Sequence, residues 1–120
     1  MTEWKGSSAI MNETGQKDET RLLRSVGLCV RAGKAIFGTP MVCEAMRRGG
    51  KQMPVLVLEA GDTSENTHKK LTDKCQFYGV RHVRLSCSGE ILAAAVGKTG
   101  ALAAVAITDK EMSRMAEQSI

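Results

Sequence analysis

Apolar residues along the chain fall into short blocks whose spacing switches between that of a helix and that of a strand. In the first block Leu22, Val26 and Cys29 share one helical face, and Asp18 or Thr20 can cap the helix. Glycines end the helices of this half, as left-handed C-terminal positions favour. The elements predicted here are a helix at 18–32, a strand at 35–37 and a helix at 40–48.

The second half of the chain continues the same alternation. A continuous apolar run at its start is typical of a central strand covered on both faces, and residues 59–62 are expected to turn out of that strand. Thr108-Asp109 caps a final helix whose inward residues are Met112, Met115 and Ala116. Before that helix come a strand at 55–58, a helix from 62–64 to 78, a strand at 80–85, a helix at 90–96 and a strand at 101–107. This order predicts an α/β sandwich, with a small sheet between two layers of helices.

A chain of 120 residues, 42% of them hydrophobic, is large enough for one core and too small for two. Residues 1–17 are polar without an apolar period, and we expect a disordered tail there, with Met1 and Met11 both open as starts. Residues 18–120 are then one domain. No apolar run approaches the roughly 18–20 residues that span a bilayer, and the first residues lack the pattern of a signal peptide. A cytoplasmic protein without membrane contact is expected.

The four cysteines and two histidines do not have the spacing of a metal site. Zinc and redox sites usually place two ligands or thiols two to four residues apart, and here none are so close, with His68 and His82 offering no matching spacing either. Cys29, Cys43 and Cys75 fall among apolar residues of predicted helices, which favours buried free thiols. We therefore expect neither a metal nor a cofactor.

The positive charge of the chain is concentrated in one stretch. Residues 21–51 carry seven basic residues and one acid, whereas residues 1–20 carry two basic and four acidic residues and residues 52–120 carry eight of each. A basic patch of this kind is typical of a nucleic-acid-binding surface. A solvated basic helix face is the alternative that the charge count alone leaves open.

Residues 31–40 place a helix N-terminus behind a glycine. Thr39 can cap the second helix by accepting a backbone hydrogen bond, and Pro40 suits the first helical position because its missing N–H would be unpaired there. Gly38 leaves space for another molecule to approach the backbone. The N–H groups and partial positive charge of such a terminus suit an anion such as a phosphate.

Several segments carry a resemblance to a known family. They are Arg31-Ala32-Gly33-Lys34 with Gly38, the run Asp-Thr-Ser-Glu-Asn-Thr at 62–67 with Leu-Thr-Asp-Lys-Cys at 71–75, and Val96-Gly97-Lys98 with Val-Ala-Ile-Thr-Asp-Lys at 105–110. From about Thr20 to Met115 the chain resembles the ribosomal protein L7Ae/L30e family, and within it the bacterial YlxQ-like subgroup. The resemblance implies a three-layer α-β-α sandwich with a small mixed four-stranded sheet. It also implies binding of kink-turn RNA, a sharply bent helix with tandem sheared G·A pairs.

The resemblance also implies which residues contact RNA. In the family the second helix begins with glycine, a small residue, asparagine and glutamate, and these positions fall on Gly38, Thr39, Pro40 and Met41; a lysine position further on is Glu44. Proline and methionine cannot form the hydrogen bonds to guanine edges, and losing two such contacts of ~1–3 kcal/mol each weakens specific binding by roughly a hundredfold to ten-thousandfold. The expected contact residues are Gly38, Thr39, Met41, Arg47, Arg48, Lys98, Thr99, Gly100, Ala101 and Leu102.

Three hypotheses for function follow. The leading one is a non-catalytic, ribosome-associated monomer that binds structured, kink-turn-like RNA, with ribosomal proteins as candidate further partners. The alternative is a protein-interaction module on the same fold that has lost kink-turn binding and docks through Pro40-Met41. An enzyme is not expected, since Gly97-Lys98-Thr99-Gly100 lacks P-loop spacing and precedes a strand, and nothing places Asp73, Asp109 and Glu111 in one cleft.

Overall fold

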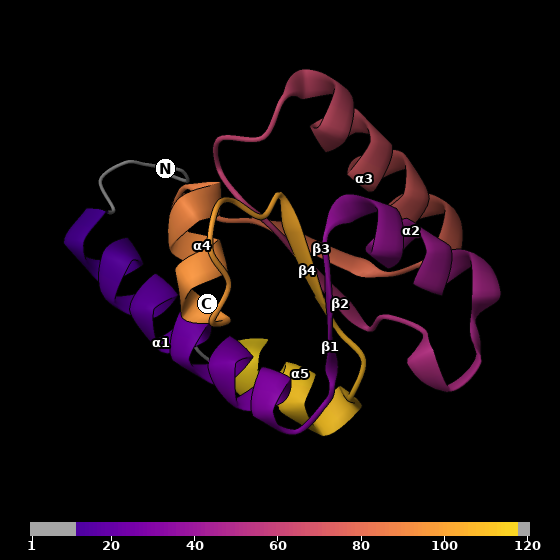
Figure 1. Cartoon of the computed structure of the whole chain (residues 1–120), viewed down its shortest axis with the longest axis horizontal. Helices are drawn as coiled ribbons and strands as arrows, with labels where there is room; N and C mark the ends of the chain where they lie inside the picture. The colour runs from indigo at the N-terminus through magenta and orange to yellow at the C-terminus, as the bar shows by residue number, and fades with distance from the viewer. Residues whose placement is uncertain (1–11, 118–120) are drawn as a thin grey trace.

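The structure, a computed structural model, describes residues 12–117, and within them helices alternate with short strands (Figure 1). The elements are α1 (Asn12–Arg31), β1 (Ala35–Phe37), α2 (Thr39–Arg48), a 3-10 helix η1 (Gly50–Gln52), β2 (Leu56–Glu59), α3 (Glu65–Tyr78), β3 (Arg81–Arg84), α4 (Gly89–Ala95), β4 (Ala104–Ile107) and α5 (Lys110–Glu117). The strand–helix alternation that the apolar pattern predicts is thus confirmed.

The four strands form one mixed sheet in the order β1-β4-β2-β3. Strand β4 is antiparallel to both of its neighbours, β1 and β2, whereas β2 and β3 are parallel. Strands β1, β2 and β3 therefore all run in the same direction, and their last residues Phe37, Glu59 and Arg84 lie at one end of the sheet. We call this the C-terminal end of the sheet; the α2 N-terminus follows directly from it.

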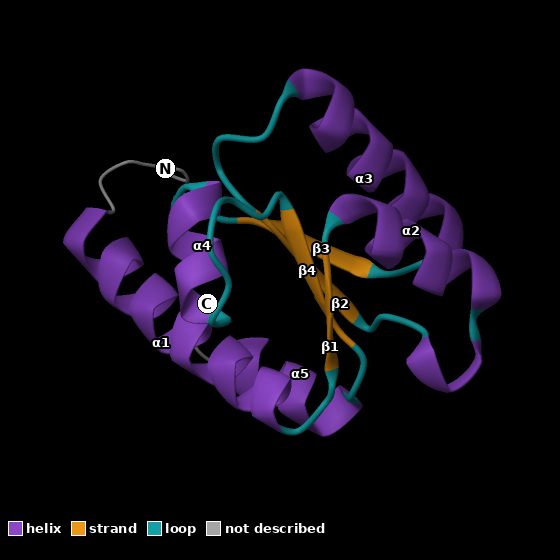
Figure 2. Cartoon of the chain, in the orientation of Figure 1, coloured by secondary structure: helices purple, strands orange, loops and turns teal. Residues whose placement is uncertain are grey.

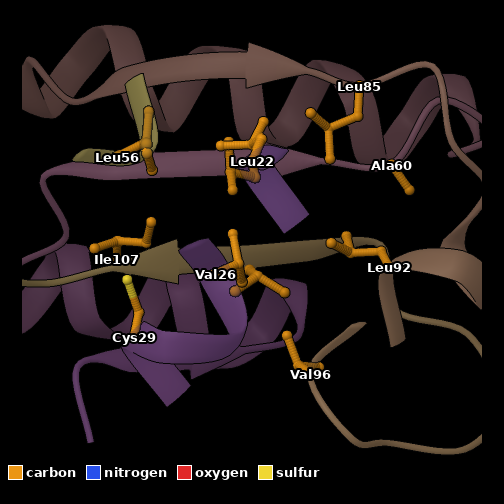
Figure 3. Packing of buried hydrophobic residues seen from close by; sticks show 12 residues of the cluster. Leu22, Val26, Cys29, Leu56, Ala60, Leu85, Leu92, Val96 and Ile107 are labelled. Atoms are coloured by element: carbon orange, nitrogen blue, oxygen red, sulfur yellow. The ribbon is translucent and has the colours of Figure 1, made fainter. Parts of the chain in front are cut away.

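Helices cover both faces of the sheet, so the three-layer α-β-α sandwich is confirmed (Figure 2). One face packs against α1, α4 and α5 through a cluster that includes Leu22, Val26, Leu92 and Ile107 (Figure 3). The other face packs against α2 and α3 through a second cluster, whose sheet residues are Val57, Ala104 and Ala106. Strands β2 and β4 are buried along their whole length, as their continuous apolar runs predict.

Two sequence predictions need correction. Of the predicted tail, residues 1–11 lie outside the described residues and residues 12–17 belong to α1, which begins at Asn12. Glu, Gln and Lys have good helix propensity, so a polar stretch without an apolar period can still extend a helix. Met115, predicted to point inward, is 42% exposed, because α5 packs against the core through Met112 and Ala116, one helical turn apart.

The cysteines are free thiols at different depths. Cys29 and Cys75 are buried as predicted, whereas Cys43 and Cys87 are half-buried. Burial raises the pKa of both Cys75 and Cys87 to about 11, which keeps these thiols neutral and poorly reactive at physiological pH. Among the described helices, none combines the length and the apolar character that crossing a membrane requires.

Candidate nucleic-acid interface

The N-terminus of α2 is formed by Gly38, which turns the chain from strand into helix. The backbone N–H of Gly38 donates to the Ala104 carbonyl oxygen at 2.9 Å and so extends the β1–β4 ladder by one residue. Gly38 then adopts φ 86° and ψ 145°, a conformation that is essentially open only to glycine. Gly38, and not Thr39, is the N-cap, so the predicted capping by Thr39 is wrong: its hydroxyl is buried and has no hydrogen-bond partner among the described residues.

Two backbone donors at this helix tip have no acceptor within the described part of the chain. Pro40 has no N–H, and the N–H of Val42 donates to the Gly38 carbonyl oxygen at 2.9 Å. In a helix that begins at Thr39, the N–H groups of Thr39 and Met41 are therefore the ones without an intrahelical acceptor. Together with the partial positive charge of the helix N-terminus, they favour an anion at this position.

The loop at residues 98–102 lies beside the helix tip. The Lys98 ammonium is 5.0 Å from the centroid of the Phe37 ring, at the end of β1. The other end of the loop is held by a hydrogen bond of 3.0 Å from the Leu102 N–H to the Gly89 carbonyl oxygen. A Cβ atom on Gly89 would be 2.9 Å from the Leu102 carbonyl oxygen, so this close approach requires glycine. Two parts of the predicted interface, the tip and this loop, are thus brought together.

Arg47 and Arg48 are not at the tip but in the last turn of α2. Thr39 and Arg48 are nine residues apart, which is about 14 Å along a helix. Both guanidinium groups bind Glu44: Arg47 Nη2 lies 2.6 Å and Arg48 Nε 2.9 Å from its Oε2 atom. These hydrogen bonds lower the pKa of Glu44 to about 2. Met41, Glu44 and Arg48 lie on one face of α2 at helical spacing, so Arg48 extends the tip surface along the helix.

The positive charge of residues 21–51 does not gather at the tip. The chain passes from α1 through β1 to α2, and these helices cover opposite faces of the sheet (Figure 2). Arg24 and Arg31 lie on α1 beside α4, where they line a groove with Leu28 and Gly97. The prediction of one basic face is therefore wrong, because a stretch that is contiguous in sequence crosses the sheet.

Sequence reasoning missed a basic residue that the fold brings to the C-terminal end of the sheet. Arg84 pairs with Glu59 in the parallel β2–β3 ladder, so it is at the same end of the sheet as Gly38. Its side chain is 43% exposed, with Nη2 3.4 Å from the Gly61 carbonyl oxygen. The alternation of the predicted strand at 80–85 indicated its face, but the parallel pairing that places it here comes only from the fold.

Glu59 was expected in a turn, yet it is the last residue of β2 and is fully buried. Its carboxylate contacts Thr63 and both histidines of the chain. Burial raises the pKa of Glu59, but hydrogen bonds from Thr63, His68 and His82 outweigh that effect and leave the pKa below its usual value of 4.5.

Known proteins resemble this chain in sequence. The sequence profile of the ribosomal protein L7Ae/L30e/S12e/Gadd45 family matches residues 20–117. The chain is 38% identical over 85 residues to RNA-binding protein YlxQ of Bacillus subtilis (strain 168), covering 71% of this chain and 80% of that protein. It is 36% identical over 81 residues to RNA-binding protein YlxQ of Enterococcus faecium, covering 68% and 73% of the two proteins.

Two solved structures have a similar fold. A protein with unknown function from Bacillus halodurans C superposes with a TM-score of 0.74 at 27% identity, covering 82% of this chain and 95% of that one. The Giardia lamblia 15.5kD RNA binding protein superposes with a TM-score of 0.69 at 18% identity, covering 85% and 83% of the two chains. At that low identity the second likeness concerns the fold alone.

Proposed function

The chain belongs to the ribosomal protein L7Ae/L30e/S12e/Gadd45 family, and from that premise we propose that it is a non-catalytic protein that binds structured, kink-turn-like RNA. Two relatives at 38% and 36% identity are named RNA-binding proteins, which supports RNA as the partner. The observation that carries the proposal is the meeting of the α2 tip with the 98–102 loop. There the Lys98 ammonium lies over the ring of Phe37, the residue directly before Gly38.

The proposed interface holds the sugar-phosphate backbone at the helix tip. A phosphate at the tip accepts hydrogen bonds from the Thr39 and Met41 N–H groups, while Gly38 leaves room for its close approach. Lys98 supplies positive charge beside this point and Arg48 supplies it along α2, whereas Arg84 supplies it at the same end of the sheet but on the opposite edge strand. These contacts neutralise phosphates, so binding falls steeply as the salt concentration rises.

Recognition in this proposal depends on the shape of the RNA more than on its bases. Pro40 and Met41 replace residues that would read guanine edges, and the loss of those contacts lowers the affinity for a kink-turn. Met41 is 60% exposed and offers an apolar surface against which a base or sugar can pack. The carboxylate of Glu44 is neutralised by two arginines, which reduces its repulsion of a nearby phosphate.

We propose a cytoplasmic monomer whose RNA is ribosomal or similarly structured, with ribosomal proteins as further partners. Sedimentation of a cell lysate through a sucrose gradient tests the ribosomal setting. The protein is expected to migrate with ribosomal particles at low salt and to leave them at high salt; migration only at the top of the gradient at both salt concentrations contradicts that setting.

Titration of a fluorescent kink-turn RNA by anisotropy tests the activity itself. A duplex of the same length without the bulge is the matched control. The kink-turn is expected to bind more tightly than the duplex, with an affinity that falls as salt increases. Absence of binding to either RNA by the folded protein at micromolar concentration and low salt contradicts the proposal.

A protein-interaction module is the second candidate, and the exposed apolar tip favours it. Pro40 and Met41 are both exposed in the first turn of α2. Capture of partners from a nuclease-treated lysate separates the candidates. A protein partner that remains bound after nuclease treatment, and is lost on Met41→Ala, favours docking; loss of all partners with the nuclease favours RNA.

A further inference from the structure

A buried glutamate and the two histidines of the chain converge at the C-terminal end of the sheet. The Glu59 side chain is fully buried, and its Oε1 atom lies 2.9 Å from His68 Nδ1 and 2.7 Å from His82 Nε2. One ligand atom from each of the three residues lies within 4.8 Å of the other two. These are the only histidines in the chain, and they come from two different elements.

The fold accounts for this convergence. In the parallel ladder His82 is opposite Val57 and therefore shares the sheet face of Val57 and Glu59. Helix α3 covers that face (Figure 1), with Leu71 packed in the same cluster as Val57. His68 precedes Leu71 by three residues, so its side chain lies one helical turn nearer the helix start and reaches Glu59.

The two carboxylate oxygens of Glu59 have different surroundings. Oε2 accepts a hydrogen bond from the Thr63 hydroxyl and lies 3.6 Å from Arg84 Nε; it is also 3.0 Å from His68 Nδ1. Oε1 faces the two imidazole nitrogens. Thr63 and Arg84 thus orient the carboxylate through one oxygen, as outer partners orient metal ligands in proteins, and leave the other oxygen directed at the histidines.

We propose that Glu59, His68 and His82 bind a divalent transition-metal ion of the zinc type. Two imidazole nitrogens and one carboxylate oxygen form a ligand set that suits Zn²⁺, whereas Mg²⁺ and Ca²⁺ prefer oxygen ligands throughout. The ion takes the place of the present contacts between the imidazole nitrogens and Oε1. This site does not depend on RNA binding.

The three ligand atoms lie within 4.8 Å of one another and must adjust their spacing to accept such an ion. Bonds of about 2.0–2.1 Å in a tetrahedral site place ligand atoms roughly 3.3–3.4 Å apart. The present separations of 2.7 and 2.9 Å are shorter, so each ring moves outward by about half an ångström. The His68 side chain is 39% exposed, which leaves room for that movement and a path for a water molecule to the fourth position.

Metal titration of the chelator-treated protein without an affinity tag tests the site. We expect one equivalent of Zn²⁺ to bind by calorimetry and one of Co²⁺ to give visible d–d absorption bands without thiolate charge transfer. Nitrogen-15 NMR should show metal-dependent shifts at Nδ1 of His68 and Nε2 of His82. Binding through cysteine, or no binding of either ion by the folded protein, overturns the proposal.

Variants identify the ligands. His68→Gln and His82→Gln should each weaken Zn²⁺ binding by more than the roughly 10- to 100-fold that loss of an outer partner costs. Glu65→Gln is the matched control: it removes an exposed carboxylate from the first turn of α3 and should leave binding unchanged. Circular dichroism checks that each variant is folded. Retention of wild-type affinity in both folded histidine variants overturns the proposal.

Discussion

Gly38 links the geometry of the helix tip to RNA binding, and Gly38→Ala separates its structural role from its functional one. At φ 86° and ψ 145° an alanine is strained, although its Cβ would come no closer to the protein than 4.0 Å, at Pro40 Cδ. Gly38→Ala should therefore lower the free energy of unfolding through backbone strain, by about 1–3 kcal/mol. For a domain of this size each kcal/mol lowers Tm by roughly 4–8 °C.

The same substitution should also weaken RNA binding, because it adds a methyl group at the proposed contact surface. In the proposed interface the new methyl group lies on the residue next to the Thr39 N–H and is expected to hinder the approach of a phosphate. Loss of one hydrogen bond to a charged group costs about 1.5–3 kcal/mol, which corresponds to roughly 10- to 150-fold weaker binding. Anisotropy with the kink-turn RNA, at a temperature where the variant is folded, measures this loss.

Gly79→Ala is the matched control for Gly38→Ala. Gly79 ends α3 in a left-handed conformation, φ 69° and ψ 33°, and a Cβ there would meet nothing within 4 Å. One residue separates it from β3, whose first residue Arg81 pairs with Leu56 at the opposite end of the sheet from the α2 tip. Alanine should cost about 1–2 kcal/mol of stability and leave RNA affinity unchanged. Unchanged affinity in folded Gly38→Ala, or equal loss in Gly79→Ala, refutes the reasoning.

Three further predictions concern other parts of the molecule. Because Arg47 and Arg48 lower its pKa, the Glu44 carboxyl should titrate at about 2 by carbon-13 NMR. The stability that this carboxylate contributes is then present above pH 4.5 and is lost as the pH falls through about 2. Titration near 4.5 would contradict the hydrogen bonds from the two arginines. Lys98→Gln should weaken RNA binding and make the logarithmic salt dependence shallower by about one unit, as salt-series titrations will show; an unchanged slope places Lys98 away from phosphate. Leu58→Ala in the buried β2 strand should lower the free energy of unfolding by about 2–5 kcal/mol in urea denaturation; a loss well below that range means that the core collapses around the site.

Periodicity along the chain was sufficient to predict most elements and their buried faces. The continuous run before Glu59 indicated a covered strand, and Ser64 does cap α3 by accepting a hydrogen bond from the Thr67 N–H. Such signals are local, since each depends on residues within one or two turns. The start of α1 at Asn12 escaped prediction because polar residues can form a helix without leaving an apolar pattern.

What the sequence did not reveal depends on contacts between distant segments. Lys98 meets Phe37 because the loop before β4 packs beside β1, and no spacing in the sequence indicates this. His68 and His82 are fourteen residues apart and meet only because α3 covers the β2–β3 ladder. The basic stretch gave a wrong prediction for the opposite reason. Arg31 and Arg48 belong to one basic stretch of the sequence, but they lie on α1 and α2, which cover opposite faces of the sheet.

Amide chemical-shift mapping during titration with a kink-turn RNA at low salt tests whether RNA is held between the α2 tip and the 98–102 loop. We expect saturable shifts that are largest at Gly38, Thr39, Met41 and residues 98–102, and small shifts in α5. Absence of shifts, or shifts confined to α1 and α5, would contradict it.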